Sequence, residues 1–352
     1  MFMNCFGASV PTGTETPLRQ LRLFAILALC VTNADSIAAD EPQVKEIPAA
    51  VEAATTTDAV PVADKSGPSA GRQIAVVLCG HPGDQEHLEL FRASVEKIRT
   101  GLSAHYQFQP ENIHVFMGED PGGEDTGESV PAVEVPEKTG SLPATKPATK
   151  EVIAAELLTL KSQITINDRL FVIVIGHTYF ENNLAWYNLH GPDVQQKEFA
   201  ELFQGIPAKE QVFFVTIPCG GYYIRTLTGP GRYVISATES DLEINETLCP
   251  HILADMFSAA PMTDWDLDSD KRISLFEFYI ALCRGVADRY IDETLIATEH
   301  ALLDDNADGK GSELQQHYLT EDQGGLPTNR QRQKLTEGRD GMASSSMYIT
   351  SF

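Results

Sequence analysis

A histidine and a cysteine each stand at the end of a strongly apolar run. Residues 171–176 precede His177, and residues 213–218 precede Cys219. A thiolate attacks carbonyl carbons well, but a free thiol near neutral pH is mostly protonated. An imidazole within hydrogen-bond reach accepts that proton and later returns it to the leaving amine. The two residues therefore predict acyl-transfer chemistry, with His177 as general base and Cys219 as nucleophile.

A second set of residues has the spacing of a calcium ligand set. Residues 266–277 have the length and pattern of an EF-hand loop, in which oxygen ligands wrap Ca²⁺ from fixed positions. Positions 1, 3, 5, 7 and 12 are filled by Asp266, Asp268, Asp270, the carbonyl of Arg272, and Glu277. Lys271 occupies position 6, where Gly normally permits the sharp turn. We expect calcium to bind here, the alternative being a solvated acidic loop.

A second loop opens in the same way. Asp304, Asn306 and Asp308 occupy positions 1, 3 and 5 of this loop. Its closure is weaker, because position 8 is Gly311 and position 12 is Gln315. We expect a second calcium site here, and the alternative is an Asx/Gly turn that ends the preceding helix.

The elements that position these side chains alternate between strands and helices. Continuous apolar runs predict buried strands, and apolar residues spaced by three and four predict helices. The predicted strands are 73–79, 112–117, 170–175, 185–189, 211–217 and 232–237, and the predicted helices are 88–102, 153–164, 199–203 and a long helix from 277 to 303. This order predicts a doubly wound α/β fold with a mainly parallel sheet. Ligands bind such sheets at the carboxyl ends of the strands, where His177 and Cys219 stand.

The two strand ends resemble those of the caspase/legumain group of cysteine peptidases. Residues 171–177 are similar to the strand that delivers the family's histidine, and residues 213–219 to the strand that delivers its cysteine. Cys219 followed by Gly220 and Gly221 also fits part of the caspase signature. The resemblance covers roughly residues 73–258 and is nearer to legumain. It implies a caspase/legumain-like fold and peptide-bond hydrolysis in a peptide or protein substrate through a thioester intermediate.

Departures from the family pattern leave another function open. Thr178 follows His177 where the family has Gly, Gly80 stands where the family has Arg, and Pro218 precedes the cysteine. These departures favour the alternative of a catalytically inactive, caspase-like scaffold that binds calcium.

Other residues compete for the proposed roles. A small shift in alignment puts Ile217 in the place of the nucleophile. His81 follows the first predicted strand and His190 precedes a glycine, so each is a rival to His177.

The N-terminus predicts export. An apolar run at 23–31 is too short to span a bilayer, and small residues at 36–39 suit a signal peptidase. We expect a signal peptide over 1–39 and a periplasmic or secreted protein. An uncleaved anchor and a lipoprotein modified at Cys30 are the alternatives.

The rest of the chain divides by composition. Residues 40–70 predict a disordered linker, 71–260 the α/β domain, and 118–148 a long loop or insertion within it. Residues 261–318 predict a helical, EF-hand-like segment, and 326–352 a disordered tail.

The charge of the chain excludes one class of partner. The chain has 50 acidic and 26 Lys and Arg side chains, which gives a net charge of −24. Nucleic acid is therefore not an expected partner, because binding to phosphates requires a basic face. After signal cleavage we expect no membrane partner, since no other stretch is long and apolar enough to span a bilayer.

Overall fold

The structure, a computed structural model, describes residues 71–118, 144–240, 243–326 and 335–351. The predicted signal peptide, the predicted linker 40–70 and residues 119–143 of the predicted loop lie outside the described residues. Among the described helices, none combines the length and the apolarity that a bilayer crossing requires.

Strands and helices alternate through the first half of the described chain, as the apolar patterns predict. In chain order the elements are β1 (Gln73–Cys79), α1 (Gln85–His105), β2 (Ile113–Met117), β3 (Lys146–Pro147), α2 (Lys150–Gln163), β4 (Arg169–Ile175), β5 (Thr178–Glu181), β6 (Leu184–Tyr187), β7 (Val194–Gln195), α3 (Gln196–Leu202), β8 (Glu210–Val215), α4 (Gly221–Leu227), β9 (Arg232–Ser236), α5 (Cys249–Ser258), β10 (Arg272–Ser274), α6 (Leu275–Asp292), β11 (Leu302–Asp304) and β12 (Tyr348–Ser351).

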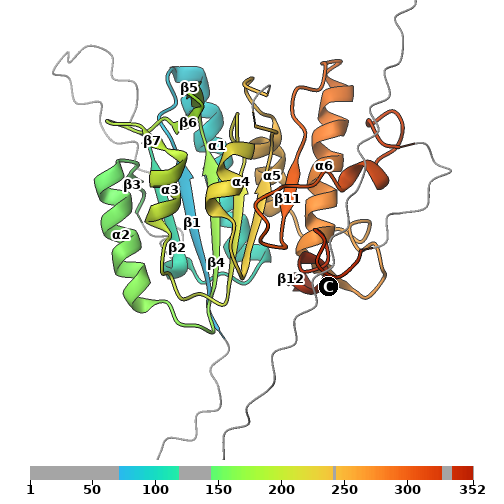
Figure 1. The fold of residues 1–352 in the computed structure, drawn as a ribbon, viewed down its shortest axis with the longest axis horizontal. Coiled ribbons are helices and arrows are strands. Elements are labelled where there is room, and N and C mark those ends of the chain that lie inside the picture. Colours follow the sequence, from blue (N-terminus) through green and yellow to red (C-terminus); the bar gives the residue numbers. More distant parts are fainter. Residues whose placement is uncertain (1–70, 119–143, 241–242, 327–334, 352) are drawn as a thin grey trace, which may run out of the picture. The chain divides into compact units, whose positions relative to one another are not determined.

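The central sheet has the strand order β11-β9-β8-β4-β1-β2-β3 (Figure 1). All neighbouring pairs are parallel except β11 with β9, which is antiparallel. The predicted α/β class, with a mainly parallel sheet flanked by helices, is therefore confirmed. After β4 the chain makes the small antiparallel sheet β5-β6-β7, and β10 pairs with β12 near the C-terminus.

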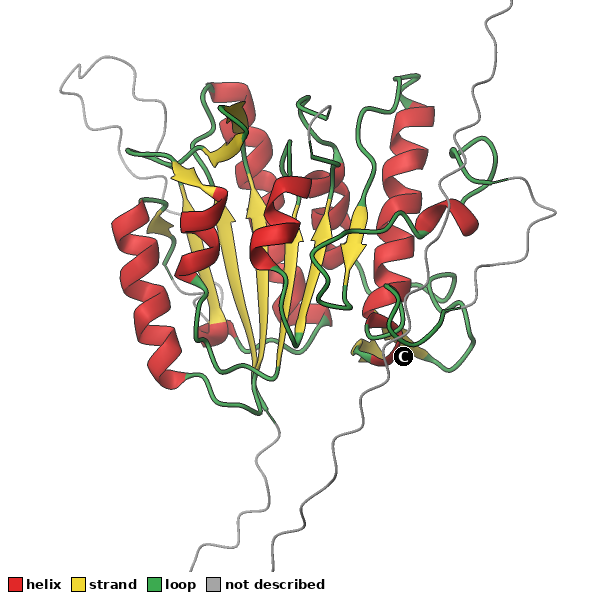
Figure 2. Cartoon of the chain, in the orientation of Figure 1, coloured by secondary structure: helices red, strands yellow, loops and turns green. Residues whose placement is uncertain are grey.

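The central strands are buried on both faces, and their side chains alternate between two cores. Along β4, Phe171, Ile173 and Ile175 belong to the core that also contains residues of α1, α5 and α6. The residues between them belong to the second core, with α2, α3 and α4. Figure 2 shows the strands between these two layers of helices. The face on which a side chain leaves the sheet therefore decides which helices it contacts.

The segment predicted as a separate helical unit, 261–318, is instead built into the sheet domain. Helix α6 ends at Asp292 rather than near 303, and Thr294 just beyond it has φ 55°. The chain then returns and adds β11 to the sheet edge beside β9. Residues of α6 share a core with strand residues, so the predicted boundary at 260/261 does not separate two hydrophobic cores.

The prediction of a disordered tail over 326–352 is wrong for residues 335–351. This segment forms a 3₁₀ turn at Ser344–Ser346 and the strand β12. Met347 and Ile349 are buried in the core that contains α6. The sequence is polar on average, but two well-placed apolar side chains and a strand pairing anchor it.

A buried carboxylate supports the start of α5. The carboxylate of Glu299 accepts hydrogen bonds from the N–H groups of Leu248 (2.8 Å) and Cys249 (3.3 Å). Free N–H groups at a helix start attract negative charge. Burial nevertheless raises the pKa of Glu299 to about 7.

This raised pKa predicts a pH-dependent stability. Because the pKa of Glu299 is higher in the folded than in the unfolded chain, its contribution to stability is complete below the ordinary glutamate pKa of 4.5 and is lost as pH rises through about 7. A shift of this size corresponds to about 3 kcal/mol across that window.

The Glu299→Gln variant should therefore lose less stability than the wild type between pH 4.5 and pH 8. Urea unfolding at several pH values measures this slope, and Glu201→Gln, at an exposed position of α3, is the control. Equal slopes for Glu299→Gln and wild type would contradict the assignment.

Candidate functional site

The two predicted site residues lie beyond the carboxyl ends of neighbouring strands. β4 and β8 are parallel, with Val174 opposite Val215. His177 lies two residues beyond β4, and Cys219 four residues beyond β8. The structure thus brings both residues to the same edge of the sheet, as predicted from parallel strands.

The imidazole of His177 is directed toward α1. Its Nε2 lies 2.9 Å from the carbonyl oxygen of Pro82. Its ring centroid is 4.7 Å from that of His87 and 5.2 Å from that of Phe91, both on α1. His87 is in turn held by Asp84 and Glu246, with distances of 2.8 and 2.9 Å.

The thiol of Cys219 lies on the opposite face of the sheet. Cys219 is 1% exposed and belongs to the core that contains Tyr223 and Ile224 of α4. Burial raises the pKa of this thiol, and a hydrogen bond with the hydroxyl of Thr178 offsets part of the rise. A buried thiol with a raised pKa holds its proton and is a weak nucleophile.

The structure therefore pairs Cys219 with Thr178 rather than with His177. Side chains of consecutive residues leave an extended chain on opposite sides. Thr178 consequently faces the α4 side, where its hydroxyl also donates to the carbonyl of Pro218 at 2.5 Å. Among the described contacts these are the partners of the two side chains, and the dyad stays a prediction.

The backbone around Cys219 is also committed to internal hydrogen bonds. The N–H of Cys219 donates to the carbonyl of Glu243 (2.9 Å), and that of Gly220 to the hydroxyl of Thr238 (2.7 Å). An oxyanion site requires N–H groups that are free to meet a developing charge. These two amides are not free in this conformation.

The rival residues occupy structural positions. Ile217 is fully buried. The ring of His81 accepts from the N–H of Gly83 (3.1 Å) and stacks on His190, with centroids 6.3 Å apart. The four cysteines of the described residues are buried free thiols: Cys79, Cys219, Cys249 and Cys283.

The predicted calcium loop at 266–277 is folded as a loop. One carboxylate oxygen each from Asp266, Asp268 and Asp270 lies within 4.8 Å of the others. The carboxylate of Glu277, at position 12, accepts from the N–H of Leu267 (2.8 Å) and from the N–H of Ser274 (2.9 Å). Glu277 therefore joins the two ends of the loop.

The turn forms although position 6 lacks a glycine. Lys271 has φ 65°, the left-handed conformation that glycine adopts without strain. Its N–H donates to Asp266 Oδ2 at 2.9 Å, which helps to hold this conformation. Ser269 at position 4 has the same φ of 65°.

The loop that begins at Asp304 repeats this geometry. Positions 4 and 6 are Ala307 and Gly309, with φ 64° and 74°. The position 6 N–H donates to the first Asp in both loops, at 2.9 Å to Asp266 and 3.1 Å to Asp304. The position 5 N–H donates to position 3, and the position 7 N–H to position 5, in both loops.

The two loops close differently. The side chain of Gln315, at position 12 of the second loop, accepts from the hydroxyl of Tyr279 and is thereby occupied. The carboxylate of Asp340, from the C-terminal segment, accepts at positions 2 and 9 of the second loop, as Glu277 does in the first. Asp340 accepts from the hydroxyl of Ser312 (2.5 Å) and from the N–H of Asp305 (3.2 Å). Sequence spacing gave no sign of Asp340, because it is distant in the chain and lies in the segment predicted to be disordered.

The donor set suits a hard divalent cation. Carboxylate and carbonyl oxygens are the ligands that Ca²⁺ prefers, and in the first loop three carboxylate oxygens converge. In the first loop Asp266, Asp268, Asp270, the Arg272 carbonyl and Glu277 would hold the ion. In the second, Asp304, Asn306 and Asp308 would do so.

Comparison with known proteins finds likeness among solved structures but none in sequence. No protein-family model matches the chain, and no curated protein matches it. The structure is similar to a crystal structure of caspase-1 from Spodoptera frugiperda, with a TM-score of 0.40 and 10% sequence identity. The match covers 69% of this chain and 91% of that one. At this identity and score, nothing about activity or site residues is transferred to this chain.

The environment of Cys219 predicts low reactivity in the folded protein. Iodoacetamide should modify Cys219 at least about tenfold more slowly in native protein than in protein unfolded in urea, because the thiol is buried and protonated. Peptide mass mapping of the four cysteines measures these rates. Fast native labelling of Cys219 that is lost in His177→Ala would show that the imidazole activates the thiol, and would contradict the contacts described.

Proposed function

We propose that this protein is a non-catalytic α/β scaffold that binds calcium through two loops near its C-terminus. The observation that carries the proposal is the shared geometry of the loops at 266 and 304, which have the same left-handed positions and the same backbone donors to carboxylates. The positions of His177 and Cys219 on different faces of the sheet support the non-catalytic part.

Burial distinguishes the two proposed ion sites. Asp304 is 1% exposed, whereas the first loop is more accessible to solvent. Burial, with the neighbouring charge of Asp308, raises the pKa of Asp304. A bound cation would compensate this charge, so an ion would stabilise the second loop more through electrostatics. The first loop has the more complete ligand set.

The C-terminal segment ties the calcium loops to each other. β12 pairs with β10, which comprises positions 7 to 9 of the first loop. The carboxylate of Asp305 in the second loop accepts from the N–H groups of Gly341 (3.0 Å) and Ser344 (2.7 Å). An ion that fixes either loop would therefore also stabilise the docking of residues 335–351.

The predicted export of the chain agrees with this function. The signal sequence proposed for residues 1–39 would deliver the protein to a compartment where calcium is abundant. Extracellular calcium modules bind with dissociation constants of about 10⁻⁴ to 10⁻³ M. Structural sites of moderate affinity would be filled under such conditions.

Cysteine peptidase activity of the legumain type is the second candidate. The observation that favours it is the arrival of His177 and Cys219 at the same edge of β4 and β8. It requires the loops after both strands to rearrange, so that the imidazole leaves Pro82 and the thiol leaves Thr178. A peptidyl acyloxymethyl ketone that modifies Cys219 in native wild type, but not in His177→Ala, would support this candidate over the first.

Calcium should stabilise the folded chain by mass action. Protein stripped with EDTA should gain several degrees in its thermal midpoint when 1 mM CaCl₂ is added. A ligand at about ten times its dissociation constant, the ratio for 1 mM CaCl₂ and a constant of about 10⁻⁴ M, contributes about 1.4 kcal/mol per site.

The rise in the thermal midpoint on addition of CaCl₂ should be smaller in the double variants Asp266→Asn/Asp268→Asn and Asp304→Asn/Asp308→Asn. Asp264→Asn, which changes an exposed carboxylate just outside the first loop, is the matched control and should keep the full gain. Melting curves that are identical with EDTA and with CaCl₂ would refute the calcium proposal, and an equal loss in the control would assign the effect to general surface charge.

A further inference from the structure

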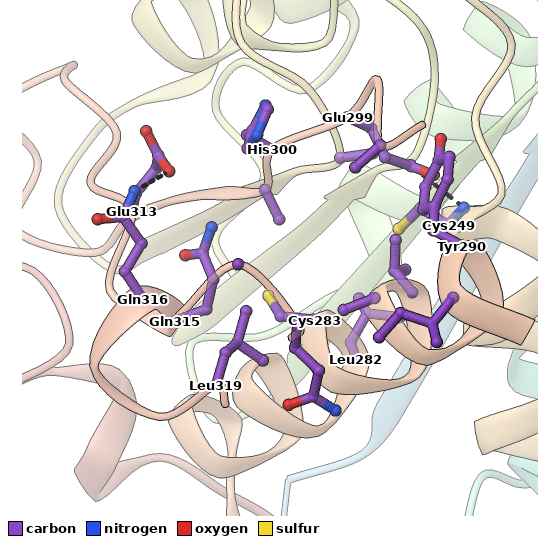
Figure 3. A pocket seen from close by; sticks show the side chains of 18 of the residues that line it. Cys249, Leu282, Cys283, Tyr290, Glu299, His300, Glu313, Gln315, Gln316 and Leu319 are labelled. Carbon is purple, nitrogen blue, oxygen red and sulfur yellow. Dashed lines mark hydrogen bonds between the residues drawn. The ribbon is translucent and has the colours of Figure 1, made fainter. Parts of the chain in front are cut away.

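A cavity of about 400 Å³ lies apart from the residues discussed for catalysis. It is enclosed by α6, the start of α5, the chain at 295–301 and the segment 313–324. It contains neither His177 nor Cys219, and none of the Asp and Asn residues of the calcium loops lines it. Figure 3 shows its lining side chains.

The walls of this cavity are largely apolar. Helix α6 contributes Leu282, Val286 and Tyr290, and the opposite segment contributes Leu319. Leu295, which also lines it, is 52% exposed. Pockets of this size with apolar walls and few polar groups are the usual form of small-ligand sites.

The charged groups of the cavity are almost all of one sign. Its acidic lining residues are Glu299, Glu313, Glu321 and Asp322, and no Lys or Arg lines it. Figure 3 shows Glu299 beside Tyr290 at one end and Glu313 beside Gln316 at the other.

The one lining histidine does not neutralise this charge. The ring of His300 is bonded through Nδ1 to the carboxylate of Glu243, so its charge is already paired. At the Glu313 end, burial and the hydrogen bond with Glu313 raise the pKa of Glu239. Two carboxyl groups therefore share this end, and the basic group near them is His300, whose ring is bonded to Glu243.

We propose that this cavity binds an organic ammonium ion with an apolar body. Its walls would bury the apolar body, and its carboxylates would hold the ammonium group by charge-assisted hydrogen bonds. An anion of the same shape would be repelled by the acidic lining, to which Glu299 adds its full charge only above its pKa of about 7. A neutral analogue would lack the ionic contact. The proposal depends on the cavity alone and is independent of calcium binding.

Three probes of one shape test the charge preference. Calorimetric titration of the full chain, with the CaCl₂ concentration held constant in cell and syringe, compares 4-phenylbutylamine, 4-phenylbutanol and 5-phenylvalerate. The amine should bind about tenfold or more tightly than the alcohol, and the carboxylate should not bind measurably.

Two variants locate the site. Glu313→Gln should bring the affinity of the amine close to that of the alcohol, whereas Glu151→Gln on the exposed side of α2 should leave the ratio unchanged. Val286→Phe, which fills the cavity from α6, should abolish binding of both probes, and its melting curve establishes that it folds.

Several results would overturn the proposal. Equal affinities of the amine and the alcohol for the wild type would show that the ammonium group makes no ionic contact in the cavity. Amine binding that survives Val286→Phe in folded protein, or that is unchanged by Glu313→Gln, would assign the amine to the acidic surface instead. Glu313→Gln keeps the shape of a partly exposed side chain and removes only its charge. Its effect on amine affinity therefore tests the proposal even if Val286→Phe does not fold.

Discussion

The alternation of side chains across a sheet that is buried on both faces constrains the rest of this structure. Each residue of β4 and β8 enters one core or the other. Beyond the strands, the ring of His177 contacts Phe91 of α1, whereas Cys219, in a turn with φ 55°, lies in the core that contains α4. His177 and Cys219 arrive at one edge of the sheet but contact different helices, and Thr178 lies beside the thiol.

In the C-terminal part of the chain, hydrogen bonds from backbone N–H groups to carboxylates stabilise the loops. Asp266 and Asp304 each accept from two amides of their own loop, and Asp305 accepts from two amides of the C-terminal segment. Such loops gather negative charge in a small volume, which costs free energy unless a cation is present. The same segment that appears polar and unstructured in sequence thereby becomes part of the fold, through Asp340 and the pairing of β12 with β10.

Much of the fold follows from local sequence, because continuous apolar runs such as residues 73–79 and 170–175 can only be buried strands of a parallel sheet. The turn geometry of the loop at 266–277 also follows from spacing alone, since the residues that bond to one another are close in sequence. The conformation of the chain after β8 does not follow from such patterns: Cys219 has φ 55°, and its side chain lies in the core that contains α4. The end of α6 at Asp292, the strand β11 and the role of Asp340 depend on contacts between distant residues, which no local pattern encodes.

The central claim, that the chemistry of this chain resides in its calcium loops, has a direct spectroscopic test. Trp265 immediately precedes Asp266 and is one of the two tryptophans of the chain, the other being Trp186. Excitation of tryptophan should sensitise the luminescence of Tb³⁺ bound in the first loop. We expect this luminescence to be displaced by Ca²⁺, to disappear in Trp265→Phe and to persist in Trp186→Phe. Absence of sensitised emission, or emission that Ca²⁺ does not displace, would contradict the account.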